Sequence, residues 1–314
     1  MPQAEMPARV ADHGNGGALD RARRRVYLPM LLPALILYVV LYVAPAIAGM
    51  LISFTTWSGL GAEATWVGFQ NYVDLFRDPV FLAALGNTLA LTLIVGVALF
   101  IIVSASMIVL RSTKGRAFIR SAVFVPAIIS PIAIGVSVSF MFNPKGLVNG
   151  ALGAVGMGAL QRPWLGPDYI LSIIVLGVIW SAAGFYAVLL MSAVDSIPES
   201  LFEAARLEGA SLFQQFRHIT LPLTRDMFST AAVLWVIAGI KTFEIILAVT
   251  GQAGIPPIQA RTLAIEQYLR VTTGESGGIP QLGSATAIGV VMTAITVILI
   301  ILSRRIARRT NLEL

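Results

Sequence analysis

The sequence predicts an all-α polytopic membrane protein with six transmembrane helices, and two observations carry that prediction. The 314-residue chain is 57% hydrophobic and only 12% charged, whereas about 25% charged residues is typical of a soluble domain. Several uncharged apolar runs also reach the ~20 residues that a helix needs to cross the ~30 Å hydrocarbon core of a bilayer. We therefore expect an integral membrane protein whose apolar runs form its helices.

Six apolar runs are long enough to be spans. They extend over Leu28 to Phe54, Leu82 to Leu110, Ser121 to Phe142, Ile170 to Val194, Met227 to Thr250 and Ala285 to Leu302. Only the fifth run contains charged side chains, those of Lys241 and Glu244. Prolines within the first and third runs do not exclude helices, since neighbouring spans can satisfy the backbone groups that a proline leaves unpaired.

The arginines and lysines outside the spans predict the orientation of the chain. If the amino terminus is cytoplasmic, the inner segments carry 16 of the 22 arginines and lysines, the outer segments carry five, and Lys241 lies within the membrane. Because cytoplasmic loops of membrane proteins are enriched in these residues, we expect both termini to be cytoplasmic. The same distribution accounts for the net charge of +6 without a nucleic-acid partner.

Two polar tails flank the predicted spans. Residues 1–26 are polar, Gly-rich and without an apolar period, which is typical of a disordered cytoplasmic tail. Residues 304–314 form a basic cytoplasmic tail, and the membrane-spanning domain between the tails covers residues 27–303, with a cytoplasmic loop at 195–223. The small residues Ala44 to Ala46 resemble a signal-peptide cleavage site, but the apolar run around them is too long for a signal peptide.

The sequence lacks the residues that several classes of enzyme and metal site require. The chain has no cysteine and no HExxH motif, so we expect neither a metal site nor a cofactor. A Walker A loop needs glycine before its lysine, and none of the three lysines has one. The sequence GESGG at Gly274 to Gly278 matches the GxSxG pattern, but it lies in a predicted outer loop, whereas His13 and His218 are predicted on the inner side.

The most polar stretch between two spans is EAARLEGASLFQQFRHITLP, which follows the fourth span. Ser196 with Glu199 and Ser211 with Gln214 each match a capping box at the start of a helix. Gly209, which lies between them, can adopt the left-handed conformation that ends a helix. The stretch therefore predicts a helix, a sharp turn and a second helix on the cytoplasmic side. Physical reasoning alone leaves two interpretations open, an amphipathic hairpin on the inner leaflet or a docking element for another protein.

The spacing of the fixed residues in this stretch resembles a known signature. It matches EAA x3 G x9 I x LP, the "EAA" loop of the membrane subunits of ABC importers, at every fixed position. These positions are Glu203, Ala204, Ala205, Gly209, Ile219, Leu221 and Pro222. The sequences SIPESLFEAARLEGAS, WVGFQNYVDLFRDPVFLAALGNTL and FNPKGLVNGAL also look like the carbohydrate-uptake branch of that family, and the resemblance extends from about Leu28 to Leu302.

The resemblance implies a type I ABC importer permease fold in the bacterial cell membrane. In such importers the loop forms a short coupling helix that sits in a cleft on a separate ATP-hydrolysing subunit. The implied partners are two copies of that ATPase, a second homologous permease, an extracytoplasmic solute-binding protein and a sugar substrate. Glu203 would pair with a basic group of the ATPase and Gly209 would set the turn. The chain itself would not be an enzyme.

The resemblance also places Lys241, Phe243 and Glu244 on the translocation path. Because Lys241 and Glu244 are three residues apart, we expect them on one helical face. They either face a cavity, or extend to the outer membrane interface or pair only with each other. Aromatic residues could stack on sugar rings or simply pack between helices. These residues are Trp180, Phe185, Tyr186 and Trp235.

One segment departs from the family pattern. Where relatives commonly have LTxGGP after the fifth span, this chain has LAVTGQAGIPP from Leu247 to Pro257, so the contact with a binding protein and the identity of the sugar stay open. The alternative function is a secondary solute carrier driven by an ion gradient. We see no convincing internal repeat and just one charged pair in the core, which favours the importer. A scaffold anchored by six helices would have no use for a capped docking loop.

Overall fold

The protein is helical over nearly all of the chain that its structure describes. The computed structural model describes residues 30–59, 61–111, 115–251, 255–272 and 278–309. Within these residues an isolated antiparallel bridge between Thr55 and Trp66 is the sole pairing of extended segments. Six helical segments in this described part of the chain are long and apolar enough to cross a membrane, which confirms the predicted all-α protein with six spans. The tail predicted at residues 1–26 lies outside the described residues.

The six apolar segments overlap the predicted spans, but the third is shifted and the fifth begins at Leu212, fifteen residues before its predicted start at Met227. They are Met30–Ile52, Pro79–Val109, Pro131–Ala154, Ile170–Asp195, Leu212–Thr250 and Leu282–Arg305. The chain divides into two units, Met1–Leu51 and Ile52–Leu314, which we describe separately. The described part of the first unit is one apolar helix with exposed side chains on almost every residue. It contains the π-helical turn η1 (Val39–Val43) and most of α2 (Ala44–Ile52).

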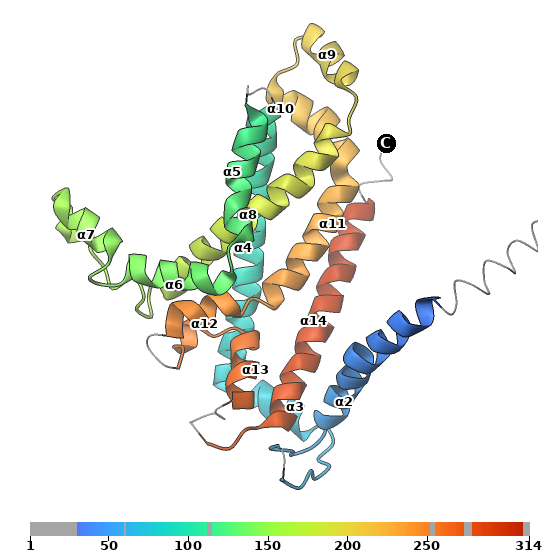
Figure 1. Cartoon of the computed structure of the whole chain (residues 1–314), viewed down its shortest axis with the longest axis vertical. Coiled ribbons are helices and arrows are strands. Elements are labelled where there is room, and N and C mark those ends of the chain that lie inside the picture. The colour runs from blue at the N-terminus through green and yellow to red at the C-terminus, as the bar shows by residue number, and fades with distance from the viewer. Residues whose placement is uncertain (1–29, 60, 112–114, 252–254, 273–277, 310–314) are drawn as a thin grey trace, which may run out of the picture. The chain divides into compact units, whose positions relative to one another are not determined.

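The second unit contains the remaining helices, shown in Figure 1. They are α3 (Gln70–Arg77), α4 (Pro79–Arg111), α5 (Arg116–Ile128), α6 (Pro131–Phe142), α7 (Leu147–Ala154), α8 (Ile170–Asp195), α9 (Glu199–Leu207), α10 (Leu212–Gln215), η3 (Phe216–Thr220), α11 (Leu221–Ile240), α12 (Glu244–Thr250), α13 (Leu263–Thr272) and α14 (Leu282–Arg309). The short turns η2 (Gly158–Leu160) and η5 (Ile258–Ala260) are 3-10 helices. Helix α14 includes residues 304–309, so the first part of the predicted basic tail is helical.

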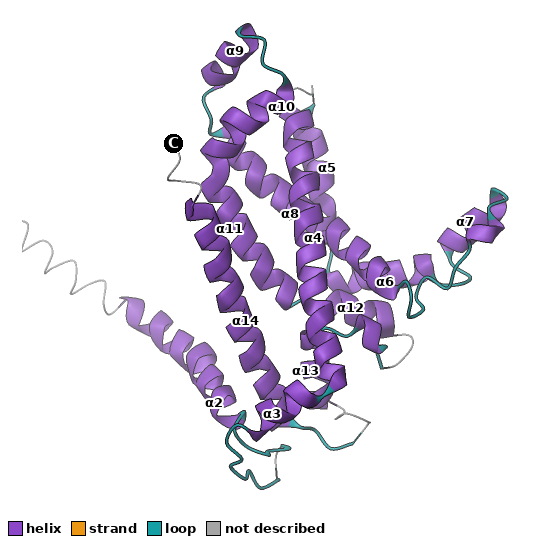
Figure 2. Ribbon diagram, turned by 180° about the vertical axis from the view of Figure 1, so that it is seen from behind, coloured by secondary structure: helices purple, strands orange, loops and turns teal. Residues whose placement is uncertain are grey.

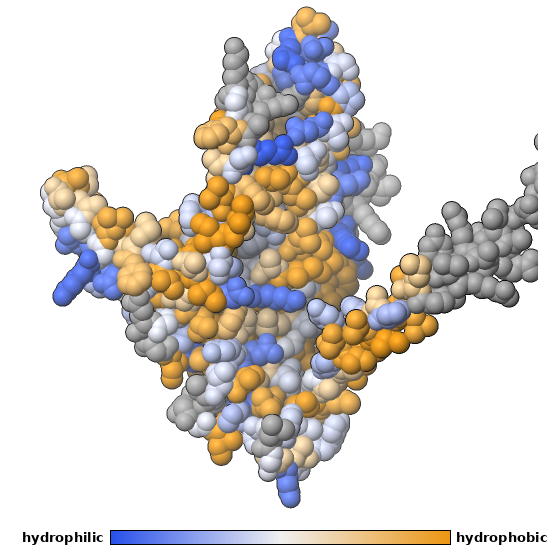
Figure 3. Space-filling view, viewed as in Figure 1, coloured by the Kyte–Doolittle hydropathy of each residue, from blue (hydrophilic) through white to orange (hydrophobic). Residues whose placement is uncertain are grey.

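The second unit has two distinct ends. Figures 1 and 2 both show α9 and α10 at one end of the long helices, and α3 and α13 at the other. Figure 3 shows hydrophilic side chains around α9 and mostly hydrophobic ones over the helices below it. The predicted cytoplasmic segment with α9 and α10 and the predicted outer segments with α3 and α13 therefore lie at opposite ends of this unit, whereas α7, in the predicted outer loop after α6, extends to the side (Figure 1). Which end is cytoplasmic stays a prediction from the charge distribution.

The core of the second unit lies mainly between α4 and α8. On α4 the side chains of Leu91, Val95 and Leu99 are buried, and their spacing of four residues puts them on one face of the helix. Helix α11 closes this core through Trp235, whose indole Nε1 donates a 2.7 Å hydrogen bond to the carbonyl oxygen of Thr92. This bond satisfies the polar edge of a large buried aromatic side chain.

The third predicted span, Ser121 to Phe142, is wrong as a single straight helix. The structure divides it into α5 and α6, with Ile129 and Ser130 in extended conformations between them. Pro131 accounts for the division, because a proline has no N–H to donate and disfavours helical geometry in the residue before it. The long apolar segment at this position instead continues from α6 through α7.

Helices α5 and α8 approach each other closely at Gly184. A Cβ atom on Gly184 would lie 2.2 Å from the carbonyl oxygen of Val123 and 2.9 Å from the Cα of Phe124. We therefore expect Gly184→Ala to lower the free energy of unfolding by about 1–3 kcal/mol, because the α5 backbone must move. Thermal unfolding of the purified protein in detergent measures this effect.

The matched control is Gly86→Ala in α4, where an added Cβ meets no atom within 4 Å. That variant should unfold at the temperature of the wild type or slightly above it, since alanine favours a helix over glycine. Equal unfolding temperatures for the wild type and Gly184→Ala would show that α5 separates from α8 without cost.

Candidate functional site

Helix α9 presents an acidic and apolar face to solvent. Phe202 anchors the helix with a side chain that is only 1% exposed. Glu203 and Leu207 are exposed and, four residues apart, lie on the same face. In the described part of the chain, Glu203 forms no salt bridge and no side-chain hydrogen bond. Its carboxylate is therefore available to a partner.

The turn after α9 is a Schellman motif. Gly209 has φ +76°, the left-handed conformation that the sequence predicts. Its N–H donates to the carbonyl of Arg206 at 3.1 Å, and the N–H of Ala210 donates to the carbonyl of Ala205 at 2.9 Å. These two bonds satisfy carbonyls that the end of a helix would otherwise leave unpaired. The prediction that Gly209 ends the first helix is confirmed.

The second helix of the hairpin begins with the predicted capping box. The backbone N–H of Ser211 donates to the side-chain oxygen of Gln214 at 2.7 Å, and the N–H of Gln214 donates to Ser211 Oγ at 3.3 Å. Buried Gln215 adds a 2.9 Å bond from its amide Nε2 to the carbonyl of Ala210. Side chains that follow the turn therefore hold its shape.

The capping box predicted at the start of α9 is wrong. Ser196 closes the end of α8 instead, where its Oγ donates to the carbonyl of Ala193 at 2.7 Å. The residue before α9 is Pro198, which has no side-chain cap. Glu199 forms a salt bridge with Arg206 on the same helix. Ser196 bonds the preceding helix because α8 extends to Asp195, the residue directly before it.

The hairpin continues into α11 without a loop. The chain is helical from Leu212 to Ile240, through the π-helical turn η3. In η3 the N–H of Leu221 donates to the carbonyl of Phe216, five residues earlier. The wide turn accommodates Pro222, whose ring would otherwise clash with the carbonyl four residues before it. The same arrangement precedes Pro45 in the first unit.

The fifth span is interrupted at the charged residues. Helix α11 ends at Ile240, residues 241–243 are not helical, and α12 begins at Glu244. Lys241 and Glu244 therefore do not share one helical face, and that prediction is wrong. Among the described residues no salt bridge joins them, and the Lys241 side chain makes no hydrogen bond.

The interruption places each charge where the adjacent helix end favours it. Lys241 follows the carboxyl end of α11 and Glu244 begins α12, positions that favour a cation and an anion respectively. This effect is worth about 0.3–1 kcal/mol for each charge. Lys241 lies between the two helices and is exposed in this structure, so its charge is not buried.

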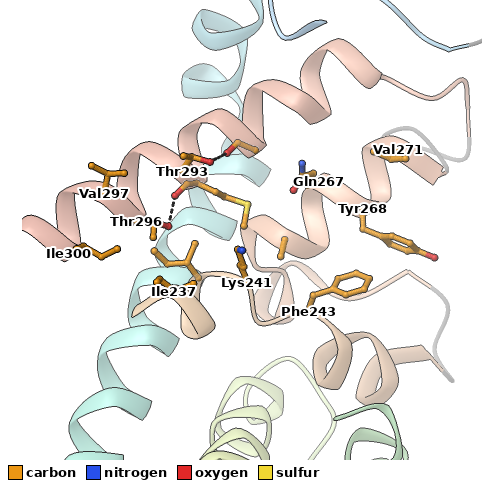
Figure 4. Close-up of a pocket in the computed structure, with 14 residues that line it drawn as sticks. Ile237, Lys241, Phe243, Gln267, Tyr268, Val271, Thr293, Thr296, Val297 and Ile300 are labelled. Atoms are coloured by element: carbon orange, nitrogen blue, oxygen red, sulfur yellow. Dashed lines mark hydrogen bonds between the residues drawn. The ribbon is translucent and has the colours of Figure 1, made fainter. Parts of the chain in front are cut away.

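A hollow of about 720 Å³ lies beside Lys241, between α11, α13 and α14. Figure 4 shows the lysine with the threonines of α14 on one side and Gln267 of α13 on the other. Phe243 and Tyr268 line the same hollow, with ring centroids 5.0 Å apart and ring planes tilted by 56°. Gln267 has no hydrogen bond to another described residue. The hollow thus combines an ammonium group, an amide and an aromatic pair.

The sequence did not predict the α13 side of this hollow. Gln267 and Tyr268 fall in what was expected to be an outer loop, and α13 has only ten residues. A weak signal was present, because Leu263, Glu266 and Arg270 recur at intervals of three and four and are all buried. Because Glu266 and Arg270 are charged, this pattern did not indicate a buried helix face.

Buried ion pairs hold α13 against its neighbours. Arg270 bonds Glu266 at 3.1 Å, Asp78 before α4, and Ser284 Oγ of α14 at 2.5 Å. Arg261 approaches the same Glu266 at 3.4 Å. The side chains of Arg270 and Glu266 are 5% and 3% exposed. Glu266 is therefore neutralised by these arginines, and it does not line the hollow.

The other aromatic candidates fall into two groups. Tyr186 and Trp235 are 4% exposed and pack edge-to-face with ring centroids 6.0 Å apart, so in this structure they are core residues. Trp180 and Phe185 are 52% and 45% exposed. A role for them in contacting a sugar stays a prediction.

The chain matches known proteins over most of its length. Residues 98–312 match the family described as "Binding-protein-dependent transport system inner membrane component". The probable ABC transporter permease protein YurN of Bacillus subtilis is 34% identical, with 86% of this chain and 91% of that protein covered. The diacetylchitobiose uptake system permease protein NgcF of Streptomyces coelicolor is 31% identical, with 95% and 88% covered.

A solved structure has a similar fold. It is the crystal structure of a bacterial ABC transporter involved in the import of the acidic polysaccharide alginate. One of its chains superposes with a TM-score of 0.78 at 23% identity, and the match covers 92% of this chain and 97% of that one. The helical arrangement described above is therefore a known one.

Proposed function

Because the chain belongs to the family of inner membrane components of binding-protein-dependent transport systems, we propose that it is one permease subunit of an ABC importer that carries a sugar. A second homologous permease completes the path, and two ATP-binding subunits supply the energy. An extracytoplasmic solute-binding protein delivers the sugar. The predicted importer permease fold is confirmed by the family match and the structural likeness.

The observation that carries this proposal is the docking hairpin. We define the docking hairpin as residues 199–215, which contain α9, the Gly209 turn and α10. Its exposed face offers the carboxylate of Glu203, which no described residue pairs, beside Leu207. Such a face suits a partner with a basic group at the edge of an apolar cleft. A hairpin lying on lipid would instead present an apolar and basic face.

The continuity of the hairpin with α11 supports a mechanical role. The far end of α11 carries Lys241 and borders the hollow. When the ATPase subunits close around ATP, they move the hairpin, and α11 moves with it. The hollow then changes its shape and its access. The chain contributes the rigid connection, and ATP hydrolysis takes place on the partners.

A sugar is the substrate class with the most support. The relative NgcF is named for the uptake of diacetylchitobiose. The hollow has the composition of a small-molecule site, with apolar and aromatic walls and a few polar groups that fix orientation. Residues of this one chain line the hollow and leave part of it open. A second permease could close the open side and complete the path.

The test of this function is a pull-down of the tagged chain from its native membranes in mild detergent, followed by mass spectrometry. We expect the wild type to retain an ATP-binding subunit, and Glu203→Lys to lose most of it, because the substitution reverses the charge of the docking face. Glu63→Lys is the matched control, since Glu63 is also exposed but lies in the loop before α3.

Two results would contradict the proposal. Recovery of the chain alone in every sample, with solute uptake driven by an ion gradient, would favour the secondary carrier. Equal recovery of the ATPase with wild type and Glu203→Lys would place the docking surface elsewhere on the chain.

A further inference from the structure

We propose that the sugar carried by this chain bears an anionic group, such as a carboxylate, phosphate or sulfonate, and that the ammonium group of Lys241 binds it. The binding site is the hollow between α11, α13 and α14. The inference rests on the proposed function, because it names the substrate class of the same path.

The first argument is the absence of a counter-charge in the hollow. None of the 14 lining residues is acidic. On α13, Glu266 is already bonded by Arg270 and approached by Arg261. Helix α14 has no acidic residue in its sequence. On α11 the acidic residue is Asp226, fifteen residues before Lys241 and so about 22 Å away along the helix. The acidic residue nearest in sequence is Glu244, which begins α12.

Glu244 does not neutralise the lysine. It lies beyond the interruption in the fifth span and lines a different, smaller hollow of about 300 Å³, which Lys241 also borders. No salt bridge within 4.0 Å joins the two side chains in the described residues. Lys241 is exposed beside the hollow and has no paired anion among the described residues, so its ammonium group is available to a ligand that brings the anion with it.

The remaining polar groups suit the oxygens of such a ligand. Gln267 offers an amide that no described residue occupies. The hydroxyl of Thr293 donates to the carbonyl of Gly289 at 2.9 Å, which leaves its oxygen free to accept. A bond from Lys241 to an anionic oxygen is charge-assisted and stronger than one to a sugar hydroxyl. Phe243 and Tyr268 provide an aromatic surface for the sugar ring.

Two other anions could bind Lys241 in place of the sugar, and the test distinguishes them. A carboxylate from the second permease could pair with Lys241 when the importer assembles, and a phosphate of a lipid could do so from the bilayer. Either would make the lysine a structural group. Loss of its charge would then affect all substrates equally or weaken assembly.

The experiment measures uptake in cells that make the complete importer from its own locus and in a strain lacking this chain. The probes are radiolabelled disaccharides in matched pairs, each neutral sugar beside the counterpart with a uronic acid or a phosphate. Sugars whose uptake disappears with the chain are then tested in Lys241→Gln and Lys241→Arg. Lys145→Gln is the matched control, because Lys145 is an exposed lysine in the loop after α6.

We expect the chain-dependent sugar to be an anionic member of a pair. Lys241→Gln should raise the KM for its uptake about ten- to a hundredfold, the range expected for a hydrogen bond to a charged group. Lys241→Arg should retain most of the uptake, and Lys145→Gln should match the wild type. The amount of each variant in the membrane, and of ATPase bound to it, should stay constant.

Several outcomes would overturn the inference. The sugar whose uptake depends on this chain could prove neutral, or it could be anionic with the same KM in Lys241→Gln as in the wild type. Either result would contradict the anionic substrate class and leave the proposed function intact. Reduced co-purification of the second permease with Lys241→Gln would assign the lysine to assembly, and an equal loss for both members of a pair would assign it to lipid or structure. If no sugar depended on the chain, the proposed function itself would fail.

Discussion

Replacing Gly209 with valine should abolish ATP-driven uptake while the protein still inserts into the membrane. The glycine has φ +76°, a conformation that costs a residue with a Cβ about 1–2 kcal/mol and a β-branched residue more. An added Cβ would meet no atom within 4 Å, so the penalty is purely one of backbone conformation. The turn should therefore open and move α9 away from its docking position.

The measurement compares uptake with the amount of protein in the membrane. We expect Gly209→Val to lower the uptake rate at least tenfold with little change in protein level. Gly209→Asn is the control, because asparagine tolerates the left-handed conformation best among residues with a side chain. If Gly209→Val transported at the wild-type rate, the hairpin would not couple the chain to an ATPase.

Replacing Arg270 with methionine should destabilise the whole second unit. Its guanidinium bonds Glu266, Asp78 and Ser284 and is almost fully buried. Removing one partner of a buried ion pair costs about 3–5 kcal/mol, because the remaining charge stays buried without compensation. Asp78 would lose its ion pair with Arg270, whereas Glu266 would keep the longer contact with Arg261.

Thermal unfolding of the purified chain in detergent checks this expectation. The control is Arg77→Met at the end of α3, next to Asp78, where the arginine is exposed and forms no salt bridge among the described residues. That variant should unfold at the wild-type temperature. A wild-type Tm for Arg270→Met would show that water or a neighbouring chain compensates Glu266 and Asp78 in the protein as purified.

The features that the sequence predicted are those with a local cause. The long apolar runs form helices because an apolar environment requires every backbone group to be bonded within the segment. Gly209 forms the turn because it can adopt a positive φ, and Ser211 with Gln214 caps α10 because both bonds are made within four residues. None of these depends on a contact with a distant part of the chain.

The interruption at residues 241–243 depends on such a contact and was missed. Neither proline nor glycine occurs in Lys241, Thr242 and Phe243. Instead, the hydroxyl of Thr262 donates to the carbonyl of Thr242 at 3.2 Å, from 20 residues away. Thr262 is itself fully buried beside α13. Because a residue of the following loop stabilises this break in the helix, the sequence of residues 241–243 does not predict it.

The uninterrupted helix from Leu212 to Ile240 sets the scale of the movement that an ATPase can transmit. These 29 residues form a rod about 40 Å long at 1.5 Å per residue. If the rod turns as one body about its docked end, a tilt of about 10° displaces Lys241 by roughly 7 Å at this length. Amplification of this kind lets a small change in the separation of two ATP-bound subunits alter the width of a distant binding site. Pro222 lies close to the docked end and removes one backbone hydrogen bond of the helix. A bend at this position would reduce the displacement that reaches Lys241.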